Sequence, residues 1–338
     1  MNRRYHMKVD ELRTALSGYD APVLKEIAVT LYKMIPKSRK EDEGLDEILL
    51  NFSKEKAKPS KKETTVDFPA LENAVETFIG HASDNLYLIP NRIVSKDKRS
   101  KWRFEVKRFI KELLAVRGED SEKAALLLAD LYDMMSYACS FWTFSSDDPF
   151  SAVGYVQQEF LSIVLSKIFY SGYNRESIKK AVFLTLDSNT DRETWHISLL
   201  YCLVAALKTP DTKEMALTEC VAFASGYKEY QAAKKAFKYS TKNDDYHVKE
   251  RNSRVAELYL LLKLSLCEYD SGIAYFWKND KERNKEITLY RLLRYFLDET
   301  DLNALWLREY EKALTRGIEP RKDLQEEYIK QKDPNYNG

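Results

Sequence analysis

The sequence predicts an all-α fold, a multi-helix bundle that continues into an α-solenoid-like array of irregular helical repeats. Glycine and proline number only 10 and 9 in 338 residues, whereas together they supply roughly 12% of an average protein. Strand-rich and doubly wound folds need many tight turns, which depend on these two residues. The apolar side chains also recur mainly at helical spacing, with short polar connections between the apolar segments. These observations favour helices throughout.

The first 50 residues are predicted to form an N-terminal helical hairpin. Its two amphipathic segments, 7–16 and 23–35, are separated by the turn sequence SGYDAP. Residues 51–66 follow as a basic linker. Most of this linker is SKEKAKPSKKETT, which is rich in lysine, contains a proline and has no large apolar side chain. Such a segment cannot bury enough apolar surface to order itself, so we expect it to be flexible.

A central helical bundle is predicted over residues 67–173. The segment 121–144 is apolar on nearly every side, which is typical of a helix in the middle of a bundle. Asp148 before Pro149 is an N-cap followed by a first-position proline, and it starts the next helix. Residues 87–96 contain a proline and show no helical period, so we expect an extended segment. The predicted helices are 68–86, 102–113, 121–144 and 149–169.

Residues 174–320 are predicted to form a helical-repeat-like region, and residues 321–338 a C-terminal tail. TDRE from Thr190 has the spacing of a capping box, Thr209 precedes a proline, and Gly226 and Gly317 lie where helices would end. No fixed period is present, and the spacing of tetratricopeptide repeats is absent. The predicted helices are 175–186, 191–208, 210–225, 227–239, 246–269, 285–297 and 301–316.

Charge and cysteine content narrow the possible classes of function. With 54 basic and 53 acidic residues, the net charge of +1 gives no overall attraction to nucleic acid or anionic lipid. No apolar run approaches the ~20 residues of a membrane-spanning helix. We therefore expect a soluble, cytoplasmic protein without a membrane partner. The four cysteines lie far apart in apolar helical patterns, so we expect buried reduced thiols: Cys139, Cys202, Cys220 and Cys267.

Residues that could support catalysis are few. None of the four histidines, His6, His81, His196 and His247, belongs to a metal or catalytic motif. His196 lies between apolar neighbours on a predicted helix, so a structural role is preferred. No nucleotide-binding loop or nucleophile elbow is present. We predict no cofactor, and an enzyme is the less favoured interpretation.

Four carboxylates leave a metal-dependent enzyme open as an alternative. Asp130 and Asp133 lie one helical turn apart, and Asp147 and Asp148 follow the same helix. If they gathered at one end of the bundle, they could bind a divalent cation. The simpler interpretation is that the first two form the polar edge of a helix while the other two cap the next one. We assign no metal site.

The most distinctive feature is a basic stretch between residues 92 and 111. On a helix, Trp102, Val106, Phe109, Ile110 and Leu113 share the apolar face, which leaves Phe104 as the only aromatic residue near the basic side. The basic side could neutralise phosphates. The preferred interpretation is a solvated face, or one that pairs with the acidic segment 40–47. The candidate nucleic-acid-binding residues are Arg92, Lys96, Lys98, Arg99, Lys101, Arg103, Lys107, Arg108 and Lys111.

The leading hypothesis is a non-enzymatic helical-repeat scaffold that binds another protein, because large helical arrays without catalytic motifs commonly serve as scaffolds. The first alternative is binding of a nucleic-acid phosphate backbone through residues 92–111. The second is a divalent-metal-dependent enzyme that uses the carboxylates near 130–148. The sequence leaves the identity of the partner and the oligomeric state open.

Overall fold

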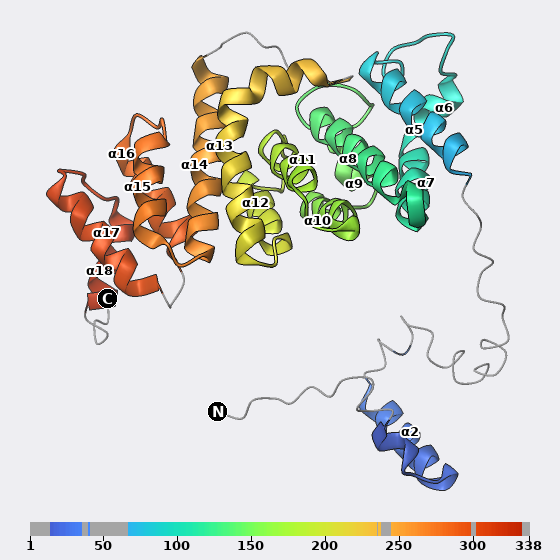
Figure 1. The fold of residues 1–338 in the computed structure, drawn as a ribbon, viewed down its shortest axis with the longest axis horizontal. Coiled ribbons are helices and arrows are strands. Elements are labelled where there is room, and N and C mark those ends of the chain that lie inside the picture. The colour runs from blue at the N-terminus through green and yellow to red at the C-terminus, as the bar shows by residue number, and fades with distance from the viewer. Residues whose placement is uncertain are drawn as a thin grey trace. The chain divides into compact units, whose positions relative to one another are not determined.

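The structure is a computed structural model that describes residues 14–35, 40, 67–234, 236–237, 245–298 and 302–332. Its internal contacts divide the chain into two units, residues 1–65 and 66–338. All the regular secondary structure assigned to the described residues is helical, which confirms the predicted all-α class (Figure 1). The finer predicted boundaries at 173–174 and 320–321 stay predictions.

In the first unit, the structure describes one long helix, α2 (Ala21–Met34), preceded by a helical turn at 14–17. The Asp20 carboxylate accepts a hydrogen bond from the backbone N–H of Val23, and a proline occupies the first turn. This N-cap explains why the helix begins there. The second helix of the predicted hairpin is thus confirmed. The predicted linker at 51–66 lies outside the described residues.

The first part of the second unit is a bundle around α8. This helix packs against α5, α7 and α10, and most of its apolar side chains are fully buried. Its central position agrees with the all-round apolar sequence of 121–138. The elements are α5 (Phe68–Ser83), α6 (Lys96–Ser100), α7 (Trp102–Ala115), η1 (Gly118–Asp120), α8 (Ser121–Ala138), α9 (Pro149–Ala152), α10 (Gln157–Ile168), η2 (Phe169–Ser171) and α11 (Arg175–Leu186).

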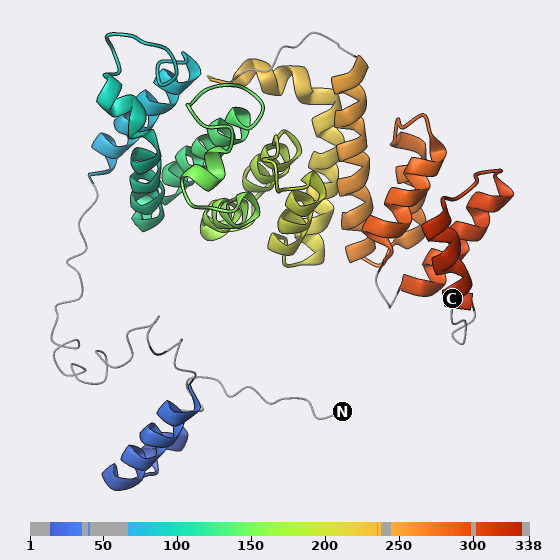
Figure 2. The same ribbon diagram turned by 180° about the vertical axis from the view of Figure 1, so that it is seen from behind.

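The rest of the second unit is an array in which helices pack in succession: α11 on α13, α13 on α14, and α14 on α15 (Figure 2). One continuous cluster of buried apolar side chains runs from Phe68 to Leu324. The elements are α12 (His196–Ala206), α13 (Pro210–Ala233), α14 (Asp245–Ser265), α15 (Tyr269–Asn279), α16 (Lys285–Arg291), η3 (Leu292–Phe296), α17 (Asn303–Thr315) and α18 (Lys322–Lys332).

Two predicted helix starts are confirmed, and two helix predictions are wrong. Asp148 and Thr209 cap α9 and α13 as expected. The single helix predicted at 149–169 is interrupted, because Gly154 adopts a left-handed conformation with φ +71°. The helix predicted from Asp191 begins instead at His196, because the Asp191 carboxylate accepts hydrogen bonds from the backbone N–H groups of Glu193 and Thr194 and holds a turn.

The largest difference from the sequence prediction concerns Gly226, which was expected to end a helix. Instead α13 continues through it to Ala233, and the last part of the helix changes direction (Figures 1 and 2). The pair Ser225–Gly226 is of the kind at which helices commonly kink. Farther along, the helix predicted at 246–269 ends at Ser265, and the predicted tail contains α18.

The cysteine prediction is partly wrong. Cys220 is buried, Cys139 and Cys202 are half-buried, and Cys267 is exposed; all four are free thiols. Cys267 has φ +61° directly after α14, the left-handed conformation that ends many helices, and this turn carries its side chain away from the core. None of the helices within the described ranges is both long enough and apolar enough to cross a bilayer.

Candidate functional site

The predicted basic stretch covers α6, α7 and the segment before them, and we call its solvent-exposed side, within residues 92–111, the basic face. All five apolar residues predicted to point inward from α7 are buried. Trp102 stacks on Phe144 with ring centroids 4.1 Å apart. Phe104 is exposed, and the Arg103 guanidinium lies 5.0 Å from its ring centroid. The structure therefore confirms a core helix with a basic outer side.

Four of the nine basic residues are engaged locally. Arg108 bridges two carboxylates, with Nη2 2.9 Å from Glu105 and Nη1 3.0 Å from Glu112. Lys101 pairs with Asp97 at 3.0 Å, while Arg99 donates to the carbonyl oxygen of Ile89. The fourth, Arg103, lies against the Phe104 ring. The ion pairs of Arg108 and Lys101 lower the net charge that is available to a ligand.

The other five basic residues have no ion-pair or hydrogen-bond partner within the described part of the chain, and we call them the free cations. They are exposed, and Lys107 and Lys111 follow Arg103 at intervals of four along one side of α7. Unpaired cations keep their full charge for an anionic ligand. The free cations are Arg92, Lys96, Lys98, Lys107 and Lys111.

The four carboxylates that might have formed a metal site have separate partners. Asp130 pairs with Lys180 at 3.0 Å, and Asp147 pairs with Arg192 at 2.9 Å. Asp148 accepts from the backbone N–H at the start of α9, while Asp133 faces the bundle interior. Within the described ranges, no group of three or more His, Cys, Asp or Glu side chains could hold a metal ion.

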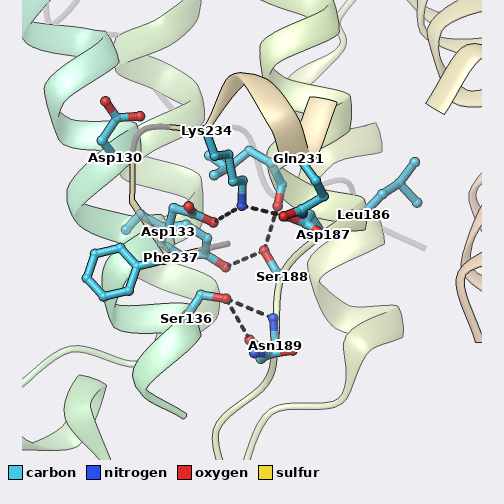
Figure 3. Close-up of polar contacts among 12 residues, drawn as sticks. Asp130, Asp133, Ser136, Leu186, Asp187, Ser188, Asn189, Gln231, Lys234 and Phe237 are labelled. Carbon is cyan, nitrogen blue, oxygen red and sulfur yellow. Dashed lines mark hydrogen bonds and ion pairs between the residues drawn. The ribbon is translucent and has the colours of Figure 1, made fainter. Parts of the chain in front are cut away.

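Asp133 belongs instead to a buried ionic network that the sequence prediction missed (Figure 3). The Lys234 ammonium lies between two carboxylates, 2.9 Å from Asp133 on α8 and 2.6 Å from Asp187 at the end of α11. The Lys234 side chain is only 9% exposed and that of Asp187 only 5%. Gln231 adds a hydrogen bond to Asp187 at 3.0 Å. We call Asp133, Asp187, Gln231 and Lys234 the ionic network.

One ammonium shared by two buried carboxylates leaves a surplus negative charge. Burial disfavours the charged form of Lys234, but Asp133 and Asp187 outweigh it, so its pKa is raised. Burial raises the pKa of Asp133 to about 6, and the attraction of Lys234 offsets this only in part. The network is therefore fully ionised only above about pH 6.

The ionic network holds down the last part of α13 and the residues after it. We call residues 227–234 with Ala236 and Phe237 the crossing segment, because it spans α11, α8 and α5. Its Tyr230 ring packs on Phe183 of α11 at 5.1 Å, and its Phe237 ring packs on Tyr137 of α8 at 5.0 Å. The backbone N–H of Phe237 reaches the Ser83 hydroxyl of α5. Three helices are thus joined by one segment.

Below the ionic network, further polar contacts lie near three loops at one end of the bundle, which are 139–148, 153–156 and 189–195. The Ser136 hydroxyl accepts from the backbone N–H of Asn189 at 2.8 Å (Figure 3). The Gln157 side chain donates to the Asn189 carbonyl and accepts from the Asp191 N–H. The ion pair between Asp147 and Arg192 adds a contact between two of these loops. The loop 189–195 is thus attached to α8 and α10, and the exposed ion pair joins it to the loop 139–148.

These three loops carry large apolar side chains that face solvent. Trp142 is 68% exposed and Trp195 is 69% exposed, and Phe141 and Val156 are also exposed. Each tryptophan ring presents a large apolar surface to water, and apolar patches on a protein surface commonly mark binding sites. We call Phe141, Trp142, Val156 and Trp195 the loop-end surface.

A cavity of 430 Å³ adjoins the loop-end surface and shares Ser140, Phe141 and Thr190 with the hollow beside Trp142. Its far side is formed by Tyr227 and by Arg251 and Arg254 of α14. Arg254 is held by Glu250 at 2.6 Å and by the carbonyl groups of Leu186 and Ser188.

Arg251 is different from Arg254. Its guanidinium carbon lies only 3.5 Å from the centroid of the Tyr227 ring. No carboxylate or carbonyl group of the described residues is within hydrogen-bonding distance of it. Burial lowers the pKa of Arg251 from its ordinary value, although Tyr227 and Asp187 offset part of that effect. It is a partly buried cation whose donors have no acceptor among the residues that the structure describes.

His196 illustrates a predicted structural residue in an unusual environment. Both ring nitrogens are buried without a hydrogen-bond partner among the residues described. Burial and the nearby charge of Arg254 hold the pKa of His196 well below its ordinary range, so the ring is neutral. Among the described residues, His196 belongs to no group of side chains that could hold a metal ion, and we assign it no catalytic role.

Comparisons with family models, with curated proteins and with solved structures returned no match.

Proposed function

We propose that this protein is a non-enzymatic binding protein that docks another protein on the loop-end surface. The observation that carries this proposal is the pair Trp142 and Trp195, each about two-thirds exposed, on two loops that the Asp147–Arg192 ion pair joins and of which the second is hydrogen-bonded to α8 and α10. Exposed tryptophans are enriched among the residues that dominate protein–protein binding. A fixed backbone limits the ordering entropy that a partner's binding costs.

The surface also has the polar rim typical of protein interfaces. Arg192 and Asp147 form an exposed ion pair beside Trp142, and such pairs at the rim help to orient a partner rather than to raise affinity. The partner chemistry that fits is an apolar or aromatic side chain set among polar groups.

The test compares two double variants in quantitative pull-down from cells. Trp142→Ala/Trp195→Ala removes the tryptophans, and Leu314→Ala/Ile329→Ala removes two exposed apolar side chains of α17 and α18 as a matched control. We expect the recovered amount of each specific partner to fall at least about tenfold with the tryptophan variant, because a hot-spot residue contributes ~2 kcal/mol or more to the binding free energy. The control should retain them. A direct binding measurement with one purified partner must also show weaker binding by the tryptophan variant than by the control variant. Equal binding by both variants would overturn the proposal.

A second candidate function, favoured by the free cations, is binding of a nucleic-acid phosphate backbone through the basic face. The surface offers charge but one exposed aromatic ring, Phe104, so binding would be insensitive to base sequence. A fluorescent generic duplex and a single strand are titrated at several salt concentrations. Binding should weaken steeply with salt, by a slope of ~0.9 for each phosphate contacted. Absence of binding at low salt would remove this candidate.

A further inference from the structure

We propose that the cavity beside Arg251 binds a small monocarboxylate, whose carboxylate pairs with the Arg251 guanidinium and whose apolar part packs against Phe141. The proposal does not depend on the proposed function, since the ligand is a free small molecule. It assigns a binding site to residues of α13, α14 and the loops that end α8 and α11.

The availability of Arg251 is the first argument. Its neighbour Arg254 donates to Glu250 and to two carbonyl groups, whereas the donors of Arg251 have no acceptor within the described residues. The Tyr227 ring lies against the Arg251 guanidinium, with the centroid 3.5 Å from the guanidinium carbon. A planar fork presented in this way matches the two oxygens of a carboxylate.

The charge of the cavity selects a monoanion. Arg254 pairs with Glu250 and Asp187 pairs with Lys234, whereas Arg251 has no ion-pair partner among the described residues. A dianion such as phosphate would bring its second charge close to Glu250 and Asp187, which would repel it. A single negative charge pairs with Arg251 and brings no second charge to these carboxylates.

The size and walls of the cavity select a ligand with an apolar group. The volume of 430 Å³ is within the range of small-molecule sites. Phe141 stacks on Tyr137 with ring centroids 4.4 Å apart, which fixes its orientation while part of the side chain remains exposed. Hydroxyl groups of Ser140 and Thr190 also line the cavity. An aryl or alkyl group of a few carbons fits between this ring and Arg251.

The experiment is isothermal titration calorimetry of the full chain with phenylacetate, its neutral isostere phenylacetamide, and inorganic phosphate. We expect saturable binding of phenylacetate, and binding at least about tenfold weaker for the amide, because the charge-assisted pair is lost. Phosphate should bind more weakly than phenylacetate. These three comparisons use the unaltered protein, so they do not depend on the folding of any variant.

Two variants then locate the site. Arg251→Met should weaken phenylacetate at least about tenfold, whereas Arg283→Met, which alters an exposed arginine outside the cavity, should leave it unchanged. Arg251→Lys keeps the charge without the planar fork and should give an intermediate loss. The proposal is overturned by the absence of saturable phenylacetate binding, by equal binding of the amide, by tighter binding of phosphate, or by unchanged binding in Arg251→Met.

Discussion

The ionic network and the basic face both contain several charged side chains, but they differ in the burial and the pairing of these charges. In the ionic network, Lys234 and its two carboxylates face one another inside the bundle and are almost completely shielded from water. On the basic face, Lys107 and Lys111 lie in solvent and have no partner within the described part of the chain. The charges of the ionic network pair with one another, whereas the free cations of the basic face remain available to an anionic ligand.

The difference predicts how each region responds to substitution. A buried charge that loses its partner is costly, because the remaining ion is neither hydrated nor paired. An exposed charge costs almost nothing to remove, because water solvates either form of the surface. The ionic network should therefore respond to substitution through the free energy of unfolding, and the basic face through ligand affinity.

The largest effect is expected for Lys234→Met. Removing the ammonium leaves Asp133 and Asp187 buried together without a counter-ion, which should lower the free energy of unfolding by about 3–5 kcal/mol. Urea denaturation measures the change. Lys180→Met is the matched control, since Lys180 pairs with the half-exposed Asp130, and it should cost less than ~1 kcal/mol. Equal losses for the two variants would show that burial of the network has no energetic consequence.

The next effect concerns pH and Asp133. Because the folded-state pKa is about 6 and the unfolded-state value is ~3.9, the folded state holds a proton between these values that the unfolded state releases. Stability from this group is therefore complete near pH 4 and is lost as the pH rises through about 6.

Asp133→Asn tests this effect. The stability of the natural protein relative to the variant should fall by about 2 kcal/mol between pH 4 and pH 7, as measured by urea denaturation at each pH. Asp130→Asn removes a carboxylate at a more exposed position of the same helix and is the matched control. A constant difference between pH 4 and pH 7 for Asp133→Asn would contradict the raised pKa.

A smaller effect is expected for Arg108→Gln, which tests a charge that is paired but exposed. Its ion pairs with Glu105 and Glu112 at helical spacing should together contribute less than ~1 kcal/mol to the free energy of unfolding. Thermal and urea denaturation in low and high salt measure the loss, which should shrink as salt screens the pairs. A loss of stability comparable with that of Lys234→Met would contradict the expectation that exposed ion pairs stabilise the fold less than buried ones.

The smallest effect on stability for each substitution is expected when the five free cations are changed to glutamine. Because none has a described partner, each substitution should alter the free energy of unfolding by ~0.5 kcal/mol or less. The same variant should lose binding of the generic duplex if the basic face contacts phosphates. Lys322→Gln/Lys330→Gln on α18 serves as the control for loss of charge elsewhere. Unchanged duplex binding would exclude the basic face as a phosphate-binding surface.

The sequence predicted those features that depend on neighbouring residues. The apolar face of α7 follows from helical spacing between Trp102 and Leu113, and the caps at Asp148 and Thr209 follow from one side chain and the proline after it. Gly226 was misjudged because the same residue that commonly ends a helix can also permit a bend within one, and only tertiary packing decides between them.

The candidate sites were predicted only in part. The basic residues of 92–111 were found by counting, but counting cannot show that Arg108 is paired while Lys107 is free. The ionic network was missed because Lys234 is 101 residues from Asp133 and 47 residues from Asp187. Arg251 was missed because its significance lies in an unused guanidinium, which no spacing in the sequence reveals.

The crossing segment has a consequence for the order of folding. Its contacts join residues far apart in the chain, with 101 residues between Lys234 and Asp133 and 154 between Phe237 and Ser83. Such contacts form only after long loops close, whereas α8 and α11 can form from local interactions. The segment should therefore dock after the transition state, so that its contacts govern how slowly the native protein opens rather than how quickly it folds.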